Sequence, residues 1–123
     1  MPIATKQNGR TVVLVPDSSI TWRTQPELKE ALDELSANGQ KQIIIDLSNV
    51  REISGYGLGL LASRCGRLRR EAGDIKLANA SESVRKLLEM TNLDALFEQF
   101  DSADSAIRSF TVIGILSDED EEE

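Results

Sequence analysis

The chain has 123 residues, which suffices for one domain with a substantial hydrophobic core. Its net charge is −7 at pH 7, but six of its 21 acidic residues form one run at residues 118–123, and the remaining 15 nearly balance the 14 basic residues. This balance argues against non-specific nucleic-acid binding, and the presence of one cysteine and no histidine excludes an intrachain disulfide and argues against a conventional zinc site or His-dependent nucleophilic catalysis.

The two ends of the chain carry separate signals. Residues 1–6 lack the apolar segment of a signal peptide, and no apolar run approaches the roughly 20 residues of a membrane-spanning helix. A run of like charges repels itself, so we expect a single domain at residues 1–116 and a disordered acidic tail at residues 117–123. We therefore expect a cytoplasmic protein that does not insert into membranes.

The first predicted elements are a β-hairpin and a helix. Residues 10–15 are β-branched and apolar, which predicts a strand, and residues 3–6 can pair with it across a turn at Asn8-Gly9. Leucines at helical spacing predict a helix over residues 24–37, with Thr24 as its N-cap. Asn38-Gly39 is typical of a helix end.

Consecutive isoleucines, Ile43 to Ile45, predict a central strand at residues 41–47 that is covered on both faces. The alternation of strands and helices then continues to residue 110, with Asp101 as the expected N-cap of the last helix. The segment at residues 111–116 is apolar and fits either an extension of that helix or a strand. These further elements are expected: a loop at 48–56, helices at 57–72, 81–90 and 101–110, and strands at 75–78 and 96–100.

This order, ββαβαβαβα, predicts an α/β fold with a four- to five-stranded, mostly parallel sheet and about four helices. Three segments in this order resemble the STAS domain family, whose name joins sulphate transporters and anti-sigma factor antagonists. They are Ile43-Ile-Ile-Asp-Leu-Ser-Asn-Val50, Gly57-Leu-Gly-Leu-Leu61 and Leu87-Leu-Glu-Met-Thr-Asn-Leu-Asp-Ala-Leu-Phe97. The resemblance covers residues 10–110 and implies a single STAS-like domain.

The resemblance implies a non-enzymatic regulatory module, similar to bacterial anti-sigma factor antagonists, that binds an anti-sigma factor or a related serine-kinase-type regulator. In such proteins, phosphorylation of a serine at the start of the second helix ends the binding. The phosphate brings about −1.5 to −2 charges to an interface that was fitted to a neutral hydroxyl.

Three polar positions of this switch are changed here. The resemblance places Tyr56 at the acceptor serine, and Ser54 and Thr21 at two positions that are usually acidic. A phenol extends further than a serine hydroxyl, so a serine kinase that positions a short hydroxyl would not modify Tyr56 efficiently. Ser54 is a weak substitute acceptor and a better N-cap. We therefore expect the phosphoserine switch to be absent.

The partner surface implied by the resemblance centres on the start of the second helix. We expect no catalytic residue, metal or cofactor, and a monomer or weak homodimer. Two alternatives remain: a structural subunit or scaffold of a larger signalling or transport complex, and a nucleotide- or anion-sensing domain that uses the Gly55–Gly59 loop. The expected partner-binding residues are Thr21, Asn49, Ser54, Gly55, Tyr56, Gly57 and Leu58.

Several side chains near this surface fit two interpretations. The Gly55–Gly59 loop is expected to be a tight turn that directs Tyr56 outward, and Tyr56 either folds over this loop or anchors a partner. Trp22 is expected to pack on the sheet edge, with the partner surface as the alternative. Cys65 is expected to pack as a small hydrophobic residue. The basic face of the second helix, at Arg64, Arg67, Arg69 and Arg70, is either a solvated face or a surface for an acidic partner, including the chain's own tail.

Overall fold

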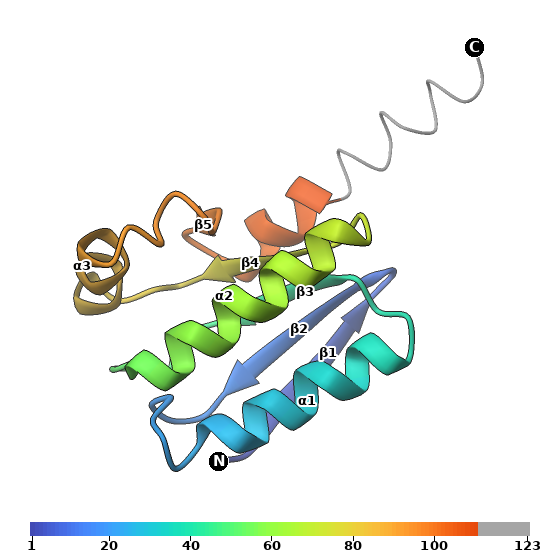
Figure 1. Ribbon diagram of the computed structural model, residues 1–123. Helices are drawn as coiled ribbons and strands as arrows, with labels where there is room; N and C mark the ends of the chain where they lie inside the picture. Colours follow the sequence, from blue (N-terminus) through green and yellow to red (C-terminus); the bar gives the residue numbers. More distant parts are fainter. Residues whose placement is uncertain (111–123) are drawn as a thin grey trace.

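The computed structural model, which describes residues 1–110, has a five-stranded sheet in the order β1-β2-β3-β4-β5 (Figure 1). Strand β1 pairs antiparallel with β2, and the other neighbours pair parallel. The architecture and the element order confirm the predicted α/β fold. The strands are β1 Ile3–Asn8, β2 Thr11–Pro16, β3 Gln42–Asp46, β4 Asp74–Ala78 and β5 Gln99–Phe100. The helices are α1 Gln25–Ala37, α2 Gly55–Arg70, α3 Glu82–Met90 and a last helix at residues 103–110.

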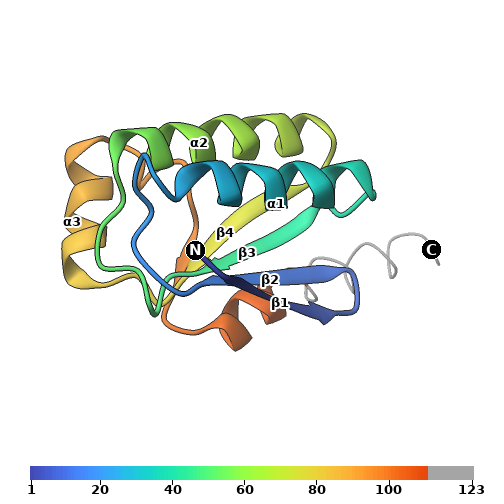
Figure 2. The ribbon, with the colours of Figure 1, turned by 90° about the horizontal axis from the view of Figure 1, so that it is seen from below.

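The sheet is covered on both faces, as the isoleucines of β3 predict. Figure 2 shows α1 and α2 on one face, the last helix on the other, and α3 beyond the ends of the strands. Ile43 and Ile45 belong to the larger hydrophobic cluster beneath α1 and α2, and Ile44 belongs to the smaller cluster beneath the last helix. All three isoleucines are fully buried. None of the helices in the described part of the chain is long and apolar enough to cross a bilayer.

Turns and helix ends follow the local sequence in part. Gly9 and Gly39 have φ values of +59° and +78°, a conformation that favours glycine, and they lie at the predicted hairpin turn and helix end. Thr24 is the N-cap of α1, but its side chain makes no capping bond. Its hydroxyl instead accepts from the Thr21 N–H and donates to the Ser19 carbonyl, so it braces the preceding loop.

The second helix starts earlier than predicted. It begins at Gly55, because the Ser54 side chain caps it by accepting from the Gly57 N–H at 3.2 Å. The loop therefore does not extend to Tyr56, which lies in the first helical turn. At the other end the helix stops at Arg70, and Ala72 has a left-handed φ of 65°.

The C-terminal elements are shorter than predicted. The expected strand at 96–100 contains only Gln99 and Phe100, because the preceding residues form a turn in which the N–H groups of Leu96 and Phe97 donate to the Leu93 carbonyl. The last helix begins at residue 103, and its cap is Ser102, not Asp101: the Ser105 N–H donates to the Ser102 hydroxyl at 3.1 Å. Residues 111–116 and the predicted acidic tail lie outside the described residues.

The basic face of α2 is not uniformly solvated. Arg64 reaches α1, where its guanidinium bonds both carboxylate oxygens of Asp33, at 2.7 and 3.3 Å. Its side chain is only 14% exposed, whereas Arg67 and Arg70 are exposed. The hydrogen bond from Arg64 lowers the pKa of Asp33, and a further bond from Lys29 acts in the same direction. This ion pair joins the two helices that cover the main core.

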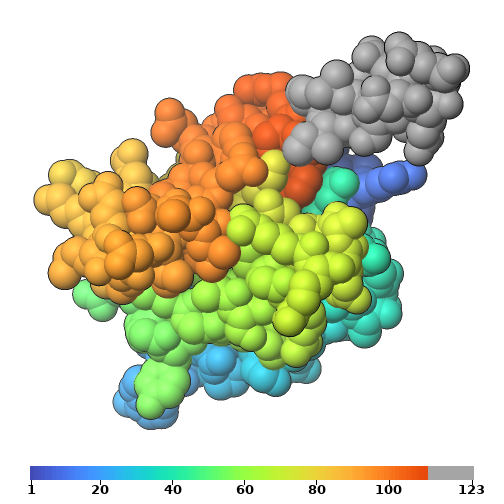
Figure 3. Space-filling view, turned by 45° about the horizontal axis from the view of Figure 1, so that its top comes forward, coloured from blue at the N-terminus to red at the C-terminus, as the bar shows by residue number. Residues whose placement is uncertain are grey.

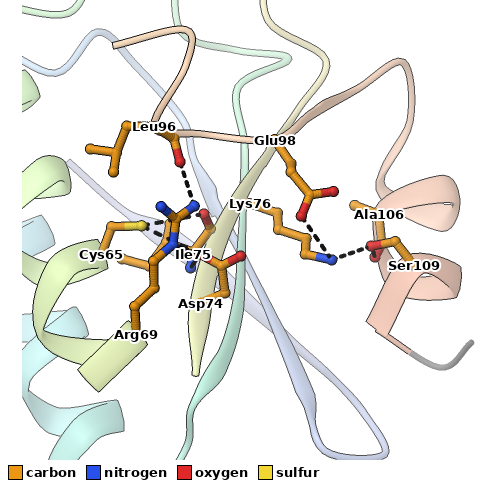
Figure 4. Close-up of polar contacts among 9 residues, drawn as sticks. All are labelled: Cys65, Arg69, Asp74, Ile75, Lys76, Leu96, Glu98, Ala106 and Ser109. Atoms are coloured by element: carbon orange, nitrogen blue, oxygen red, sulfur yellow. Dashed lines mark hydrogen bonds and ion pairs between the residues drawn. The ribbon is translucent and has the colours of Figure 1, made fainter. Parts of the chain in front are cut away.

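Strand β4 contains a buried lysine that no sequence pattern predicted. Lys76 is 1% exposed, and its ammonium group donates to the Ser109 hydroxyl at 2.7 Å (Figure 4). Glu98 lies 3.7 Å away, and the ammonium group is 4.1 Å from the centroid of the Phe110 ring. Lys76 thereby connects the sheet to the last helix. Cys65 is buried as expected, and this burial raises the pKa of its thiol.

The Asp33–Arg64 pair makes a pH-dependent contribution to stability. A carboxyl group with a lowered pKa in the folded state stabilises the protein above the usual aspartate range, and this stabilisation is lost as the pH falls through the folded-state pKa. We expect Asp33→Asn to lower the free energy of unfolding at neutral pH by about 1 kcal/mol or less, because the pair is partly exposed. Urea unfolding at neutral and acidic pH measures the difference, which should vanish on the acidic side. Asp104→Asn, at an exposed aspartate with no ion pair in the described part of the chain, is the control. A difference that persisted at acidic pH would contradict this assignment.

Candidate protein-interaction site

The loop before α1 and the loop before α2 are joined by a short parallel pairing. Ile20 bridges Ile53, the Ile20 N–H donates to the Glu52 carbonyl at 2.9 Å, and the Ser54 N–H donates to the Ile20 carbonyl at 2.7 Å. Both isoleucines are buried, at 0% and 4% exposure. In Figure 3 the start of α2 (green) and the loop before α1 (blue) lie beside each other and project at the lower left of the molecule. Two segments that are separated in the sequence thus form one surface.

A single glycine allows α2 to pack against this pairing. A Cβ atom on Gly57 would lie 2.6 Å from Cγ2 of Ile20 and 2.9 Å from Cγ2 of Ile53, whereas one on Gly55 or Gly59 would meet no atom within 4 Å. All three glycines lie inside the helix, so the predicted tight turn is wrong. The predicted close packing of the helix is confirmed, and Gly57 alone accounts for it.

The two aromatic side chains of this surface are exposed. Tyr56 is 71% exposed and Trp22 is 65% exposed, with the Arg23 guanidinium 5.2 Å from the centroid of a Trp22 ring. The expectation that Trp22 packs on the sheet edge is wrong, and Tyr56 does not fold over the helix start. The first turn of α2 contains no acidic residue. Trp22 and Tyr56 therefore give this surface two large exposed aromatic groups, which are typical of protein interfaces.

An apolar groove of about 690 Å³ borders the same surface, between residues 51–54 and α3. Thr21 and Ser54 lie in its wall, and its apolar lining residues include Ile53, Leu87 and Met90. The Met90 side chain is 80% exposed. This groove was not predicted, although Leu87 and Met90 are spaced i, i+3 and therefore lie on one side of α3.

The predicted partner-binding residues differ in their placement. The structure brings together Thr21 and Ser54, which are half-buried, with Gly55 and Tyr56, which are exposed, where the two paired loops meet. Gly57 and Leu58 are buried beneath them, with Leu58 only 5% exposed. Asn49 is exposed in the loop after β3, but it does not line the groove.

The family is decided by comparison with known proteins. The family model of the STAS domain matches residues 2–106. The chain belongs to the STAS domain family. A protein of Thermotoga maritima that bears the name putative anti-sigma factor antagonist is 26% identical over 97 residues, which cover 78% of this chain and 86% of that protein. The anti-sigma-B factor antagonist of Staphylococcus aureus is 30% identical over 73 residues, which cover 59% of this chain and 68% of that protein.

The fold is also shared with a solved STAS structure. The phosphorylated form of the Bacillus cell fate determinant SpoIIAA superposes with a TM-score of 0.71 at 20% identity, over 89% of this chain and 99% of that one. This identity is too low to transfer more than the fold. Both sequence relatives are named as anti-sigma factor antagonists.

Gly57 provides a test of how this surface is built. We expect Gly57→Ala to lower the free energy of unfolding by about 1–3 kcal/mol, because the added methyl group overlaps the Ile20 and Ile53 side chains. Gly59→Ala, two residues along the same helix in open space, should be neutral or stabilising by up to about 1 kcal/mol. Urea unfolding of the two variants gives the comparison. Equal stability of the two variants would show that Gly57 is not needed for close packing.

Proposed function

We propose that this STAS domain is a non-enzymatic regulatory module that binds an anti-sigma factor or a related serine-kinase-type regulator. The observation that carries the proposal is the pair of exposed aromatic residues, Trp22 and Tyr56, on two segments that are hydrogen-bonded to each other through Ile20 and Ser54. Aromatic side chains of this kind bury a large apolar area on binding, at a small cost in conformational entropy. The family relatives named as antagonists support this type of partner.

The pairing of the two loops supports a preformed surface. Thr21 is fixed by its N–H bond to the Thr24 hydroxyl at 2.8 Å, and its own hydroxyl accepts from the Arg23 N–H at 3.2 Å. The Ser54 side chain is occupied in capping α2. A surface that is ordered before binding loses less entropy when the partner docks. The adjoining groove beside α3 would accept apolar side chains of the same partner.

Control by serine phosphorylation on this loop is absent in the proposed mechanism. The family resemblance places Tyr56 at the acceptor position. Its phenol hydroxyl lies further from the backbone than a serine hydroxyl does, so a kinase that positions a serine hydroxyl against the γ-phosphate of ATP would not position Tyr56. Ser54 carries its hydroxyl in a capping bond at 3.2 Å. Gly57 and Leu58 already donate their N–H groups to Ser54, which disfavours anion binding by the Gly55–Gly59 segment.

The first test is phosphorylation by the partner kinase. We expect the wild-type protein, incubated with its kinase partner and ATP, to gain no phosphate at residues 48–61, and Tyr56→Ser to gain one. Intact mass measurement followed by peptide mapping distinguishes the two. Stoichiometric phosphorylation of the wild-type loop would contradict the absence of the switch.

The second test is partner affinity. We expect Trp22→Ala and Tyr56→Ala each to weaken binding by about tenfold or more, as removal of a buried aromatic anchor does at other interfaces. Arg67→Ala, at an exposed residue of α2 that does not line the groove, should leave the affinity unchanged. Calorimetry against the partner obtained by pull-down measures all three. Equal affinities for the three variants would place the partner surface elsewhere, and a mass far above that of a dimer in light scattering would favour a scaffold role.

A further inference from the structure

Four exposed cations lie at the end of the domain where α2 stops, away from the proposed partner surface. Arg10 lies in the turn between β1 and β2, Lys41 lies directly before β3, and Arg67 and Arg70 lie in the last turn of α2. Figures 1 and 2 show these three parts of the chain at the same end of the sheet. A pocket of about 570 Å³ is lined by both Arg10 and Lys41. We call these four residues the basic end.

The cations of the basic end have no partner within residues 1–110: none of the four side chains makes an ion pair or a hydrogen bond there. The neighbouring Arg69 differs, because it bonds Asp74 at 2.9 Å. Glu71 is the one carboxylate in the lining of the pocket. The dipole of α2 adds only about half an elementary negative charge at its end, which is too little to balance the remaining cations. The basic end therefore carries an excess of positive charge in a chain whose net charge is −7.

The described part of the chain ends close to this surface. The last helix runs from the carboxyl ends of the strands back toward their amino ends, because Phe100 before it pairs with the last residue of β4, whereas Ser109 bonds Lys76 in the middle of that strand. Lys76 is two residues from Asp74, whose N–H donates to the Lys41 carbonyl at 2.9 Å. Two residues of a strand span about 7 Å. The chain thus leaves the last helix near the amino ends of β3 and β4, where Lys41 lies.

The length of the remaining chain favours the basic end over other cations. The acidic run at residues 118–123 begins eight residues after residue 110, and eight residues span at most about 27 Å at full extension. Arg51 lies before the start of α2, about 24 Å further away, since the 16 residues of the helix rise about 1.5 Å each. A shorter span gives the higher effective concentration of a tethered ligand, so the acidic run meets the basic end first.

We propose that the acidic run, residues 118–123, docks on the basic end of its own molecule. Six carboxylates then face four cations that are otherwise unpaired, and salt weakens the contact because it screens exposed charges beyond about 10 Å at 0.1 M. An acidic partner would find this surface occupied, so the run would restrict protein contacts to the start of α2. The inference does not depend on the identity of the proposed partner.

The first test compares amide NMR spectra of the wild type with those of a full-length variant whose acidic run carries amides. We expect shift differences at residues 9–10, 39–42 and 67–72 and none at residues 51–56. The differences should disappear in roughly 1 M NaCl, where the screening length is about 3 Å. The variant combines Asp118→Asn, Glu119→Gln, Asp120→Asn, Glu121→Gln, Glu122→Gln and Glu123→Gln.

The second test uses a carbodiimide, which joins a carboxylate to a lysine amine in contact with it. We expect the cross-linked monomer to contain bonds from residues 118–123 to Lys41 and none to Lys86, an exposed lysine of α3. Peptide mapping by mass spectrometry locates the bonds. Joint replacement of Arg67 and Arg70 by Gln should lower the yield of the Lys41 cross-link by about threefold or more, because two of the four cations are lost.

The matched control is the joint replacement of Arg51 and Arg85 by Gln, which removes the same charge from exposed arginines outside the basic end and should leave the yield unchanged. The proposal is overturned where the amide variant causes no shift at the basic end, where Lys86 is cross-linked as well as Lys41, or where both double variants give the wild-type yield. A Lys41 cross-link found only in dimers would also overturn it, because the run would then dock on a second copy of the chain.

Discussion

The surface at the start of α2 depends on the pairing of Ile20 with Ile53. This bridge lies outside the five named strands, yet it fixes the loop before α1 against the loop before α2 by two backbone hydrogen bonds, at 2.9 and 2.7 Å. The two side chains then form the wall against which α2 packs at Gly57, within a distance that leaves no room for a Cβ atom. Because the backbone on both sides is hydrogen-bonded and the Ile20 and Ile53 side chains are buried, Trp22 and Tyr56 project from segments that are held in place. Order at this surface therefore comes from the backbone and not from packing of the aromatic rings themselves.

The edge of the sheet near β5 is held by side chains more than by strand pairing. Strand β5 pairs with β4 at only two residues. Arg69 bonds Asp74 at 2.9 Å and also donates to the Leu96 carbonyl, while Lys76 lies between Glu98 and Ser109 (Figure 4). The segment between α3 and β5 is thus held by two cations, Arg69 of α2 at Leu96 and Lys76 of β4 at Glu98. A buried ammonium group is costly unless it is paired, so removal of Glu98 or Ser109 would disturb the last helix, whereas an apolar replacement of Lys76 could be tolerated.

The sequence predicts the sheet well because its signals are local. Three consecutive isoleucines indicate a strand with two covered faces, and Asn8-Gly9 indicates the hairpin. The exposure of Trp22 could not be predicted in this way, since large aromatic residues are mostly buried and the loop that carries Trp22 is held by long-range contacts, such as the Ile20–Ile53 bridge, that no local pattern reveals. Asp101 and Ser102 are equally good caps by residue type, and only the register of the last helix decides between them. The apolar groove combines three segments that are distant in the sequence, so no local pattern could predict it.

Helix α3 forms one wall of the apolar groove, although it has only nine residues. It presents Leu87 and Met90 to the groove and buries Val84 and Leu88 against the rest of the domain. A helix of few turns is positioned mainly by its contacts and not by its own stability. The shape of the groove therefore depends on how Val84 and Leu88 pack in the main core, so substitutions at these buried residues would change the groove without altering any residue exposed in it.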